Sequence, residues 1–224
     1  MSKQFTLTAA DKHSLGAYRA DPAGTPKGGM VVVQEIFGVN HHIRAVCDRL
    51  AALGYVAVAP AVFDRFVRNF ESGYTPDEIA HARSYLGNLN WDHMMADIAA
   101  AQGDLKGVGP LGVVGFCMGG TAAFLAACRI PGFSAAVAFY GGMIGKFADE
   151  KPKCPMQMHF GEKDDGIPMS VVDEPSRRNS RRRKSTPIRM RRMAFTATSA
   201  RAIARKPATS PETDTGISHK AHEK

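Results

Sequence analysis

A chain of 224 residues, 44% of them hydrophobic and 22% charged, is long enough to bury the core of one sizeable α/β domain. It has no run of about 18 apolar residues, so no membrane span is predicted, and its first residues, MSKQFTLT, lack the apolar region of a signal peptide. The four cysteines form no C-x-x-C pair and no zinc-type spacing with histidine. We therefore expect a cytoplasmic protein with no disulfide framework, no metal and no membrane partner.

The net charge of +8 is unevenly distributed along the chain. Residues 176–224 hold 14 of the 29 Lys and Arg residues but only 3 of the 21 Asp and Glu residues, whereas the preceding part is mildly acidic. This asymmetry predicts two parts, an ordinary domain over 1–174 and a basic tail over 175–224.

Strands and helices are expected to alternate along the first part of the chain. In chain order the expected elements are one or two edge strands within 5–18, a buried strand at 30–33, a helix capped by Asn40 and closed by Gly54, a strand at 55–59, a helix opening at Thr75-Pro76, a helix at 92–105, a strand starting at 111, a helix at 121–127, strands at 134–140 and 155–160, and a helix starting at Pro168. This alternation is typical of βαβ units and a mostly parallel sheet.

Polar or reactive residues follow four of the predicted strands. Glu35, Arg65, Cys117 and Asp164 each lie at or just past a strand's carboxyl end. Because functional sites of parallel sheets lie beyond these ends, all four are candidate site residues.

The segment from Leu111 to Ala127, LGVVGFCMGGTAAFLAA, predicts a strand, a tight turn and a helix. The turn matches the G-x-S-x-G nucleophile elbow with Cys117 in place of serine. A helix N-terminus beyond the turn would favour a thiolate and a developing oxyanion. The alternative interpretation is a buried structural cysteine, which the strand–turn–helix context disfavours.

One other glycine motif suggests a cofactor but lacks the required context. Residues 107–112 fit G-x-G-x-x-G, yet the motif precedes a strand instead of following one, and Pro110 interrupts it. We therefore expect no dinucleotide and no other cofactor.

Four segments together resemble the dienelactone hydrolases, α/β-hydrolase-fold enzymes that open lactone rings. They are QEIFGVN at 34–40, GFCMGG at 115–120, AFYGG at 138–142 and HFGEKDDGIP at 159–168. The resemblance covers residues 1–174 and implies the α/β-hydrolase fold. It also implies a small-molecule lactone or ester substrate, no metal or cofactor, and a monomer or homodimer.

The resemblance further implies a role for each matching residue. Cys117 would be the nucleophile that forms a thioester, Asp164 would orient a catalytic histidine, and Glu35 would contact the resting thiol. The remaining implied roles are the backbone N–H groups of Ile36 and Met118 as oxyanion hole, Arg65 as the group that grips a substrate carboxylate, and Tyr140 as a pocket wall.

The histidine that the resemblance requires is missing from its expected position. The family carries it in a G-H-x-F segment about 30 residues after the acid, but the first histidines after Asp164 are His219 and His222. A reading frame shifted by two bases permits histidine across Arg192 and Met193, then an obligatory glycine, and permits an amphipathic terminal helix later. We therefore expect a frameshift near residue 175 and a sheet truncated at its C-terminal strand and helix.

Two other interpretations of the tail compete with the frameshift, a nucleic-acid-binding arm and a solvated disordered tail. The arm would make the chain a non-catalytic α/β domain that binds nucleic acid or acidic partners. Phe195 is the tail's only aromatic residue, so the stacking surfaces of single-strand binding proteins are absent and nucleic acid is an unlikely partner.

Overall fold

A single mixed sheet forms the centre of the computed structural model, which describes residues 1–161, 164, 166–167 and the backbone of 188–193. The eight strands lie in the order β1-β2-β4-β3-β5-β6-β7-β8. Their bounds are β1 Ser2–Thr8, β2 Ser14–Ala20, β3 Gly29–Val33, β4 Val56–Pro60, β5 Leu111–Phe116, β6 Phe133–Phe139, β7 Met156–Gly161 and β8 Ile188–Met193. The pairs β1–β2 and β2–β4 are antiparallel, and every neighbouring pair from β4 to β8 is parallel.

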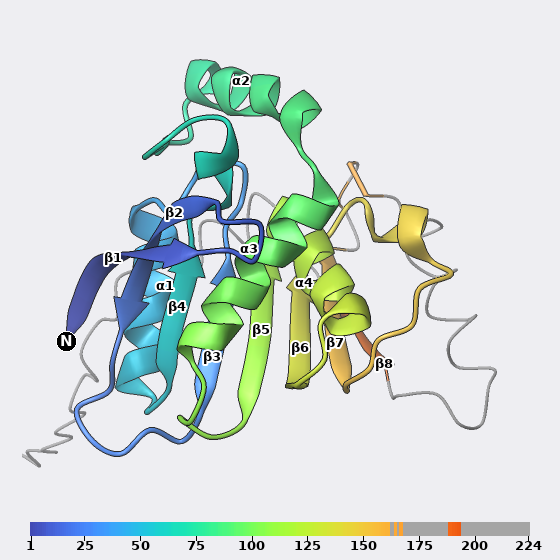
Figure 1. Cartoon of the computed structure of the whole chain (residues 1–224). Coiled ribbons are helices and arrows are strands. Elements are labelled where there is room, and N and C mark those ends of the chain that lie inside the picture. Colours follow the sequence, from blue (N-terminus) through green and yellow to red (C-terminus); the bar gives the residue numbers. More distant parts are fainter. Residues whose placement is uncertain (162–163, 165, 168–187, 194–224) are drawn as a thin grey trace, which may run out of the picture.

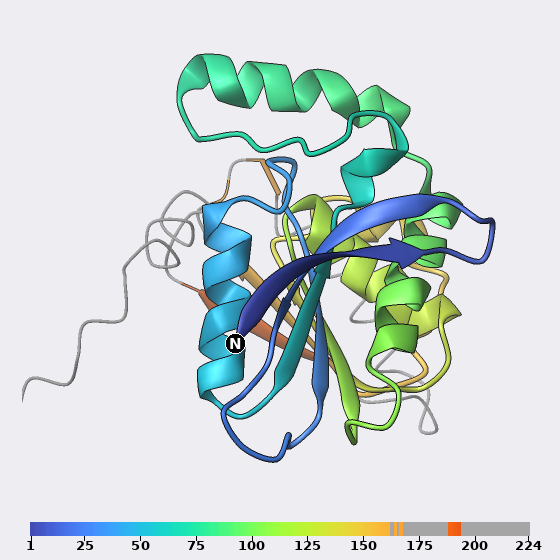
Figure 2. The same ribbon diagram turned by 60° about the vertical axis from the view of Figure 1, so that its left-hand side comes forward.

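Helices cover both faces of this sheet, which confirms the expected α/β fold. The helical elements are α1 His41–Ala52, η1 Val62–Arg65, α2 Pro76–Ser84, η2 Tyr85–Asn88, α3 Trp91–Asp104, α4 Met118–Arg129 and η3 Ile144–Phe147. Helices α3 and α4 pack on one face and α1 on the other, and α2 stands above the carboxyl ends of the parallel strands (Figures 1 and 2).

Local capping signals fix the helix ends where the sequence predicts them. The Asn40 side chain accepts a hydrogen bond from the backbone N–H of Ile43 at the start of α1. Gly54, just past the end of that helix, has φ +96°, a left-handed conformation that glycine adopts without steric cost. Thr75 and Glu78 form a capping box at the start of α2.

The central strands are apolar on both faces because the sheet separates two hydrophobic clusters. Val31, Val33 and Val113 belong to the cluster on the α3–α4 side. Val32 and Val114 point to the opposite side, into the cluster that α1 covers. This double burial explains why β3 and β5 appear in the sequence as continuous hydrophobic runs.

Strand β8 corrects the expectation that the sheet lacks its C-terminal strand. Its backbone pairs in parallel with β7, with Met156 opposite Ile188 and Gly161 opposite Met193. The arginines of the segment IRMRRM obscured an alternation of apolar and basic residues over its first four positions, a period that suits a strand. The sheet therefore takes six residues from the predicted tail, whereas the expected terminal helix and the helix starting at Pro168 lie outside the described residues.

Helix α4 lies unusually close to the sheet because two of its first residues have no side chain. A Cβ atom on Gly119 would overlap the carbonyl oxygens of Val33 and Gln34, and one on Gly120 would overlap the carbonyl oxygen of Phe139. The helix therefore contacts the backbone of both β3 and β6 at its N-terminal turn.

We predict that Gly119→Ala destabilises the protein by about 1–3 kcal/mol or more, because the helix must move away from a rigid backbone. Chemical denaturation followed by circular dichroism measures the change. The control is Gly103→Ala in α3, where an added Cβ meets no atom within 4 Å. It should be neutral or stabilise by up to about 1 kcal/mol through helix propensity. Equal effects of the two substitutions would contradict the close contact.

Candidate active site

Cys117 occupies a strained turn between β5 and α4. Its backbone has φ 55° and ψ −119°, a left-handed conformation that is costly for a residue with a side chain. The N–H of Cys117 donates to the carbonyl oxygen of Phe139 at 3.0 Å, and its own carbonyl accepts from the N–H of Gly120 at 2.9 Å. These bonds hold the strained residue between β6 and the first turn of α4, as a nucleophile elbow requires.

Cys117 also differs from the other three cysteines in its exposure. Its side chain is half-buried, whereas Cys47, Cys128 and Cys154 are buried. Burial raises the pKa of the Cys128 thiol to about 12 and raises the pKa values of Cys47 and Cys154 above their usual range. These three thiols are therefore poor nucleophiles near neutral pH.

The sheet brings four of the sequence-predicted residues to one edge. Glu35 follows β3, Cys117 follows β5, Tyr140 follows β6 and Asp164 follows β7. These four strands are consecutive neighbours and parallel, so their carboxyl ends adjoin one another.

Glu35 is a buried carboxylate held by two tyrosines. Its side chain is 1% exposed. The hydroxyl of Tyr140 lies 3.4 Å from one carboxylate oxygen and that of Tyr74 lies 3.4 Å from the other. Tyr140 is 3% exposed and has φ +40°, so a strained backbone also carries this side chain. Two phenol donors offset part of the cost of burying a carboxylate.

The sequence did not single out Tyr74, which precedes the cap of α2. Its hydroxyl also lies 3.4 Å from the side-chain nitrogen of Asn40, and its ring packs against Phe37 at 4.6 Å between centroids. These partners lie more than 30 residues from Tyr74 along the chain. No local sequence pattern could therefore predict that Tyr74 contacts them.

The two residues expected to form an oxyanion hole follow the neighbouring strands β3 and β5. Met118 is the first residue of α4, where a backbone N–H has no carbonyl four residues earlier within the helix. Ile36 follows Glu35 and is 5% exposed. The expected role of their N–H groups stays a prediction.

Asp164 lies in the turn after β7. One carboxylate oxygen accepts from the N–H of Gly166 at 3.1 Å. The other, Oδ2, is shielded from solvent and has no hydrogen-bond partner among the described residues. Asp164 Oδ2 can therefore accept a hydrogen bond from a donor that is not among the described residues.

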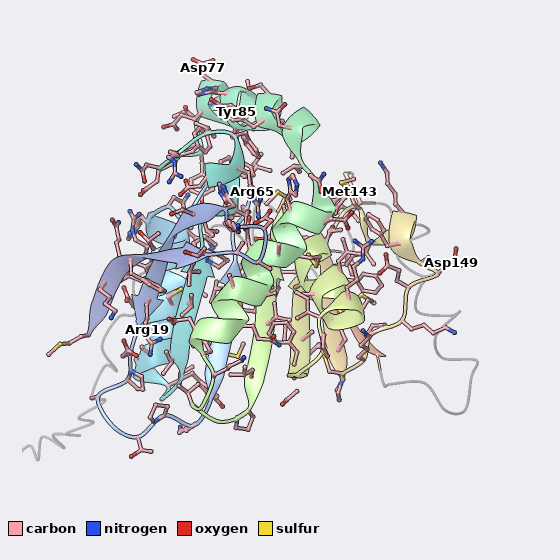
Figure 3. All side chains as sticks on the ribbon, viewed as in Figure 1. Arg19, Arg65, Asp77, Tyr85, Met143 and Asp149 are labelled. Atoms are coloured by element: carbon pink, nitrogen blue, oxygen red, sulfur yellow. The ribbon has the colours of Figure 1, made fainter. Side chains whose placement is uncertain are left out.

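The structure places Arg65 in an ion cluster between buried Asp97 and exposed Asp11. Its Nε and Nη2 bond the two carboxylate oxygens of Asp97 at 3.0 and 2.6 Å. Its Nη1 and Nη2 reach Asp11 at 2.5 and 3.3 Å. The Arg65 side chain is 12% exposed and that of Asp97 is 0% exposed. Arg65 lies where η1 meets the upper end of α3 (Figure 3).

The charge of the buried Asp97 carboxylate is stabilised by Arg65. Burial raises the pKa of the Asp97 carboxyl, and the hydrogen bonds from Arg65 oppose that effect. Removing one partner of a buried ion pair costs about 3–5 kcal/mol, because the other charge is left without compensation. A signal was available in the sequence, since Asp97 is an isolated acid among the buried residues Met94, Met95, Ile98 and Ala101 of α3.

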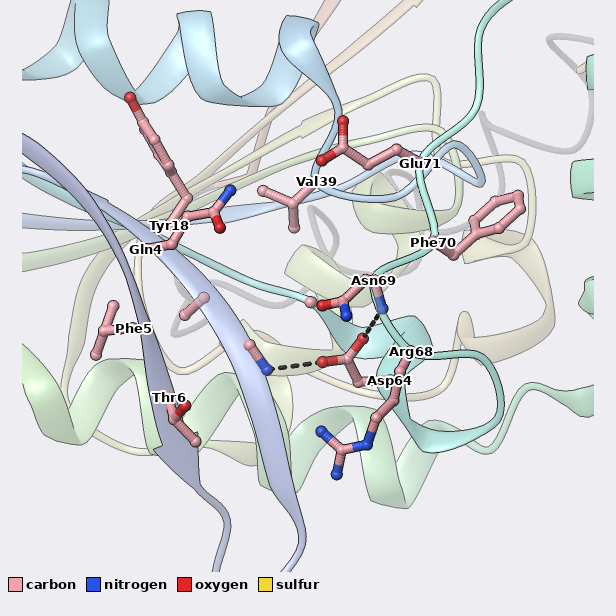
Figure 4. A pocket seen from close by; sticks show the side chains of 13 residues that line it. Gln4, Phe5, Thr6, Tyr18, Val39, Asp64, Arg68, Asn69, Phe70 and Glu71 are labelled. Carbon is pink, nitrogen blue, oxygen red and sulfur yellow. Dashed lines mark hydrogen bonds between the residues drawn. The ribbon is translucent and has the colours of Figure 1, made fainter.

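A separate pocket of about 420 Å³ lies between the β1–β2 hairpin and the loop after η1 (Figure 4). Buried Asp64 joins its two walls, accepting from the N–H of Gly16 at 2.7 Å and of Asn69 at 2.9 Å. None of the predicted site residues belongs to its described lining. This pocket is therefore distinct from the Cys117 site.

The described part of the chain holds neither a membrane-spanning helix nor a metal-binding cluster. No helix there is long and apolar enough to cross a membrane. No group of three or more His, Cys, Asp or Glu residues there could hold a metal ion.

Comparison with known proteins identifies relatives over most of the chain. A model of the dienelactone hydrolase family matches residues 15–190. A candidate carboxymethylenebutenolidase of Synechocystis sp. is 36% identical over 177 residues, which are 71% of this chain and 71% of the relative. One of Methylorubrum extorquens is 36% identical over 175 residues, 71% of this chain and 59% of the relative. Among solved structures, a candidate dienelactone hydrolase from Klebsiella pneumoniae superposes with a TM-score of 0.71 at 27% identity, over 89% of this chain and 90% of that one.

The Asp11–Arg65 contact predicts a specific dependence of stability on pH. The hydrogen bond from the Arg65 side chain has the largest effect on Asp11, and the hydrogen bond from the backbone N–H of His13 has a smaller one. Together they lower the pKa of the Asp11 carboxyl to about 2. A lowered pKa stabilises the fold above the usual carboxyl pKa, and that stability is lost as the pH falls through about 2. We expect Asp11→Asn to lower the free energy of unfolding at neutral pH and to flatten its decline between about pH 4 and 2.

Urea denaturation at several pH values measures this dependence. The matched control is Asp77→Asn, at an exposed aspartate in the first turn of α2. A decline in Asp11→Asn as steep as in the unsubstituted chain would contradict the assigned contact.

Proposed function

We propose that this chain, which belongs to the dienelactone hydrolase family, is built to cleave a lactone or ester with Cys117 as nucleophile. The observation that carries the proposal is the left-handed backbone of Cys117 at the end of β5, next to the strand β3 that the buried carboxylate Glu35 follows. Family membership also favours a hydrolase over a non-catalytic domain with a basic arm.

The acylation step uses groups at the carboxyl edge of the sheet. Glu35 accepts the thiol proton, and the Cys117 sulfur attacks the carbonyl carbon of the substrate. The carbonyl oxygen becomes an oxyanion that the N–H groups of Ile36 and Met118 stabilise. The carbon–oxygen single bond then breaks, the leaving alkoxide takes the proton that Glu35 accepted from the thiol, and a thioester with Cys117 remains.

Hydrolysis of the thioester requires a base that activates water. In a triad a histidine supplies this function and an aspartate orients it. The solvent-shielded Oδ2 of Asp164 supports the assignment of Asp164 as the orienting acid. Without a histidine we expect the chain to accumulate the thioester and to turn over slowly.

We further propose that the histidine was lost through a shift of the reading frame. One observation supports this, namely the place of the histidine that the shifted frame permits. That position, 192–193, lies opposite Phe160 and Gly161 at the carboxyl end of β8, on the same edge of the sheet as Cys117. Sequencing the coding DNA around codon 175 tests the frame directly.

Cys117 should be the most reactive of the four cysteines. In limited alkylation of the folded protein, we expect it to be labelled at least about tenfold faster than the three thiols whose pKa values burial raises. Peptide mapping by mass spectrometry identifies the labelled residue. Preferential labelling of Cys47 or Cys128 in the folded state would refute the assignment, and labelling in denaturant serves as the control for intrinsic reactivity.

Turnover should depend on the frame. With a p-nitrophenyl ester, this chain should release a burst of product of about one equivalent and then turn over slowly. A chain with the frame restored near codon 175 should turn over about 10³-fold faster or more, because its triad is complete.

Steady-state and burst assays of the two chains side by side provide the measurement. Cys117→Ala in the restored chain is the control and should abolish turnover. Equal turnover of the two chains would mean that another base, such as His219 or His222, serves the site, and would refute the proposed loss.

A further inference from the structure

We propose that the pocket between the β1–β2 hairpin and the loop after η1 binds a small aliphatic amine as its ammonium ion. The proposal rests on the buried carboxylate of Asp64 and on the groups around it, and it is independent of the proposed function. The described lining of this pocket comes from β1, β2, the loop after β3 and the segment 61–71.

Asp64 is a buried acid without a bonded cation in the described part of the chain. It is 6% exposed, and its two oxygens accept from the backbone N–H groups of Gly16 and Asn69 at 2.7 and 2.9 Å. None of the ion pairs among the described residues includes Asp64. Buried Asp97, by contrast, has Arg65 bonded to both of its oxygens. Because buried charges are normally paired, a cation bound beside Asp64 would supply the partner that Asp97 already has.

The two backbone donors use only part of the hydrogen-bonding capacity of Asp64. An ionised carboxylate has about four lone-pair sites on its two oxygens, and each oxygen of Asp64 accepts one bond from the described residues. A structural role in joining the hairpin to the loop accounts for these two bonds. It does not account for the position of the acid on the wall of a pocket of about 420 Å³, a volume typical of small-molecule sites.

Two side-chain amides face the same space from opposite walls. Gln4 comes from β1 and Asn69 from the loop after η1, and Figure 4 shows both amides directed into the space between hairpin and loop. An ammonium group has three N–H donors, which match the two amide oxygens and the carboxylate of Asp64.

The charges of the lining favour a cation over an anion. The charged side chains of the described lining are Asp64, Glu71 and Arg68. Glu71 is bonded to Arg44 at 2.5 Å. Arg68 donates to the carbonyl oxygen of Ser14 at 2.9 Å, and in Figure 4 its side chain extends away from Glu71. An anionic ligand would meet the like charge of Asp64 where burial weakens screening by water, whereas an ammonium ion is attracted to it.

The remaining lining suits a short alkyl chain. Ala17 is buried and Val39 and Ala61 are half-buried, and all three present small apolar side chains to the pocket. A ligand of the proposed class places its ammonium group beside Asp64 and its alkyl group against these side chains. The removal of apolar surface from water then adds to the affinity.

The test compares three five-carbon probes in ligand-observed NMR titrations of the full chain. The probes are pentylamine, which is a cation at neutral pH, 1-pentanol, which is uncharged, and pentanoate, which is an anion. We expect pentylamine to bind at least about tenfold more tightly than 1-pentanol, and pentanoate to bind more weakly than either. Equal affinities for the three probes, or a preference for pentanoate, would overturn the proposal.

Three variants and one control locate the bound amine. Asp64→Asn removes the charge and should lower the affinity for pentylamine at least about tenfold. Gln4→Trp places a bulky ring at an exposed position of the lining and should weaken binding to a similar extent. Asn69→Gly removes one amide at a backbone φ of +54°, which glycine adopts without strain, and should weaken binding more mildly. The control Asp77→Asn removes an exposed aspartate of α2 and should leave the affinity within about twofold.

Circular dichroism shows whether each variant is folded. If Asp64→Asn does not fold, Gln4→Trp and Asn69→Gly decide the outcome, and undiminished pentylamine binding in both would overturn the site. Binding should also persist after alkylation of Cys117, which is not part of the described lining. Loss of binding on alkylation would place the amine in the Cys117 site and would likewise overturn the proposal.

Discussion

The backbone of α4 lies directly against strands β3 and β6, and the placement of the reactive residues depends on this contact. Gly119 and Gly120 make it possible, since any side chain there would overlap carbonyl oxygens of the sheet. The hydrogen bond from Cys117 to Phe139 then fixes the turn between strand and helix. The helix N-terminus, the strained cysteine and the ends of β3 and β6 are thereby held in one rigid unit, which is the preorganisation that an acyl-transfer site needs.

Features with local causes were predictable from the sequence, and features made by distant partners were not. The cap at Asn40, the capping box at Thr75 and the elbow at Cys117 each follow from neighbouring residues, and the structure has them where expected. The partnership of Arg65 with Asp97 joins residues 32 apart, so sequence alone left Arg65 available for a substrate. Strand β8 was missed because the basic composition of its segment outweighed a short alternating pattern.

Two buried acids illustrate how neighbours decide what a carboxylate does. Asp97 has a guanidinium bonded to both oxygens, an arrangement that neutralises the charge and joins elements of the fold. Glu35 has phenol hydroxyls 3.4 Å from each of its carboxylate oxygens, and these groups are neutral hydrogen-bond donors. In the proposed mechanism Glu35 takes the thiol proton of Cys117, whereas Asp97 stays paired with its arginine. Under that proposal the same residue class serves structure at one position and chemistry at the other.

The position of β8 has a consequence for how copies of this chain behave toward each other. In the described part of the chain, β8 is the last strand of the sheet, so its outer N–H and C=O groups form an edge that another strand could join. Three of its six residues are arginine. Repulsion between these like charges opposes the pairing of two such edges, which is how natural sheets resist aggregation. In the described part of the chain, the basic composition that hides this strand in the sequence therefore also disfavours the edge-to-edge pairing of two copies.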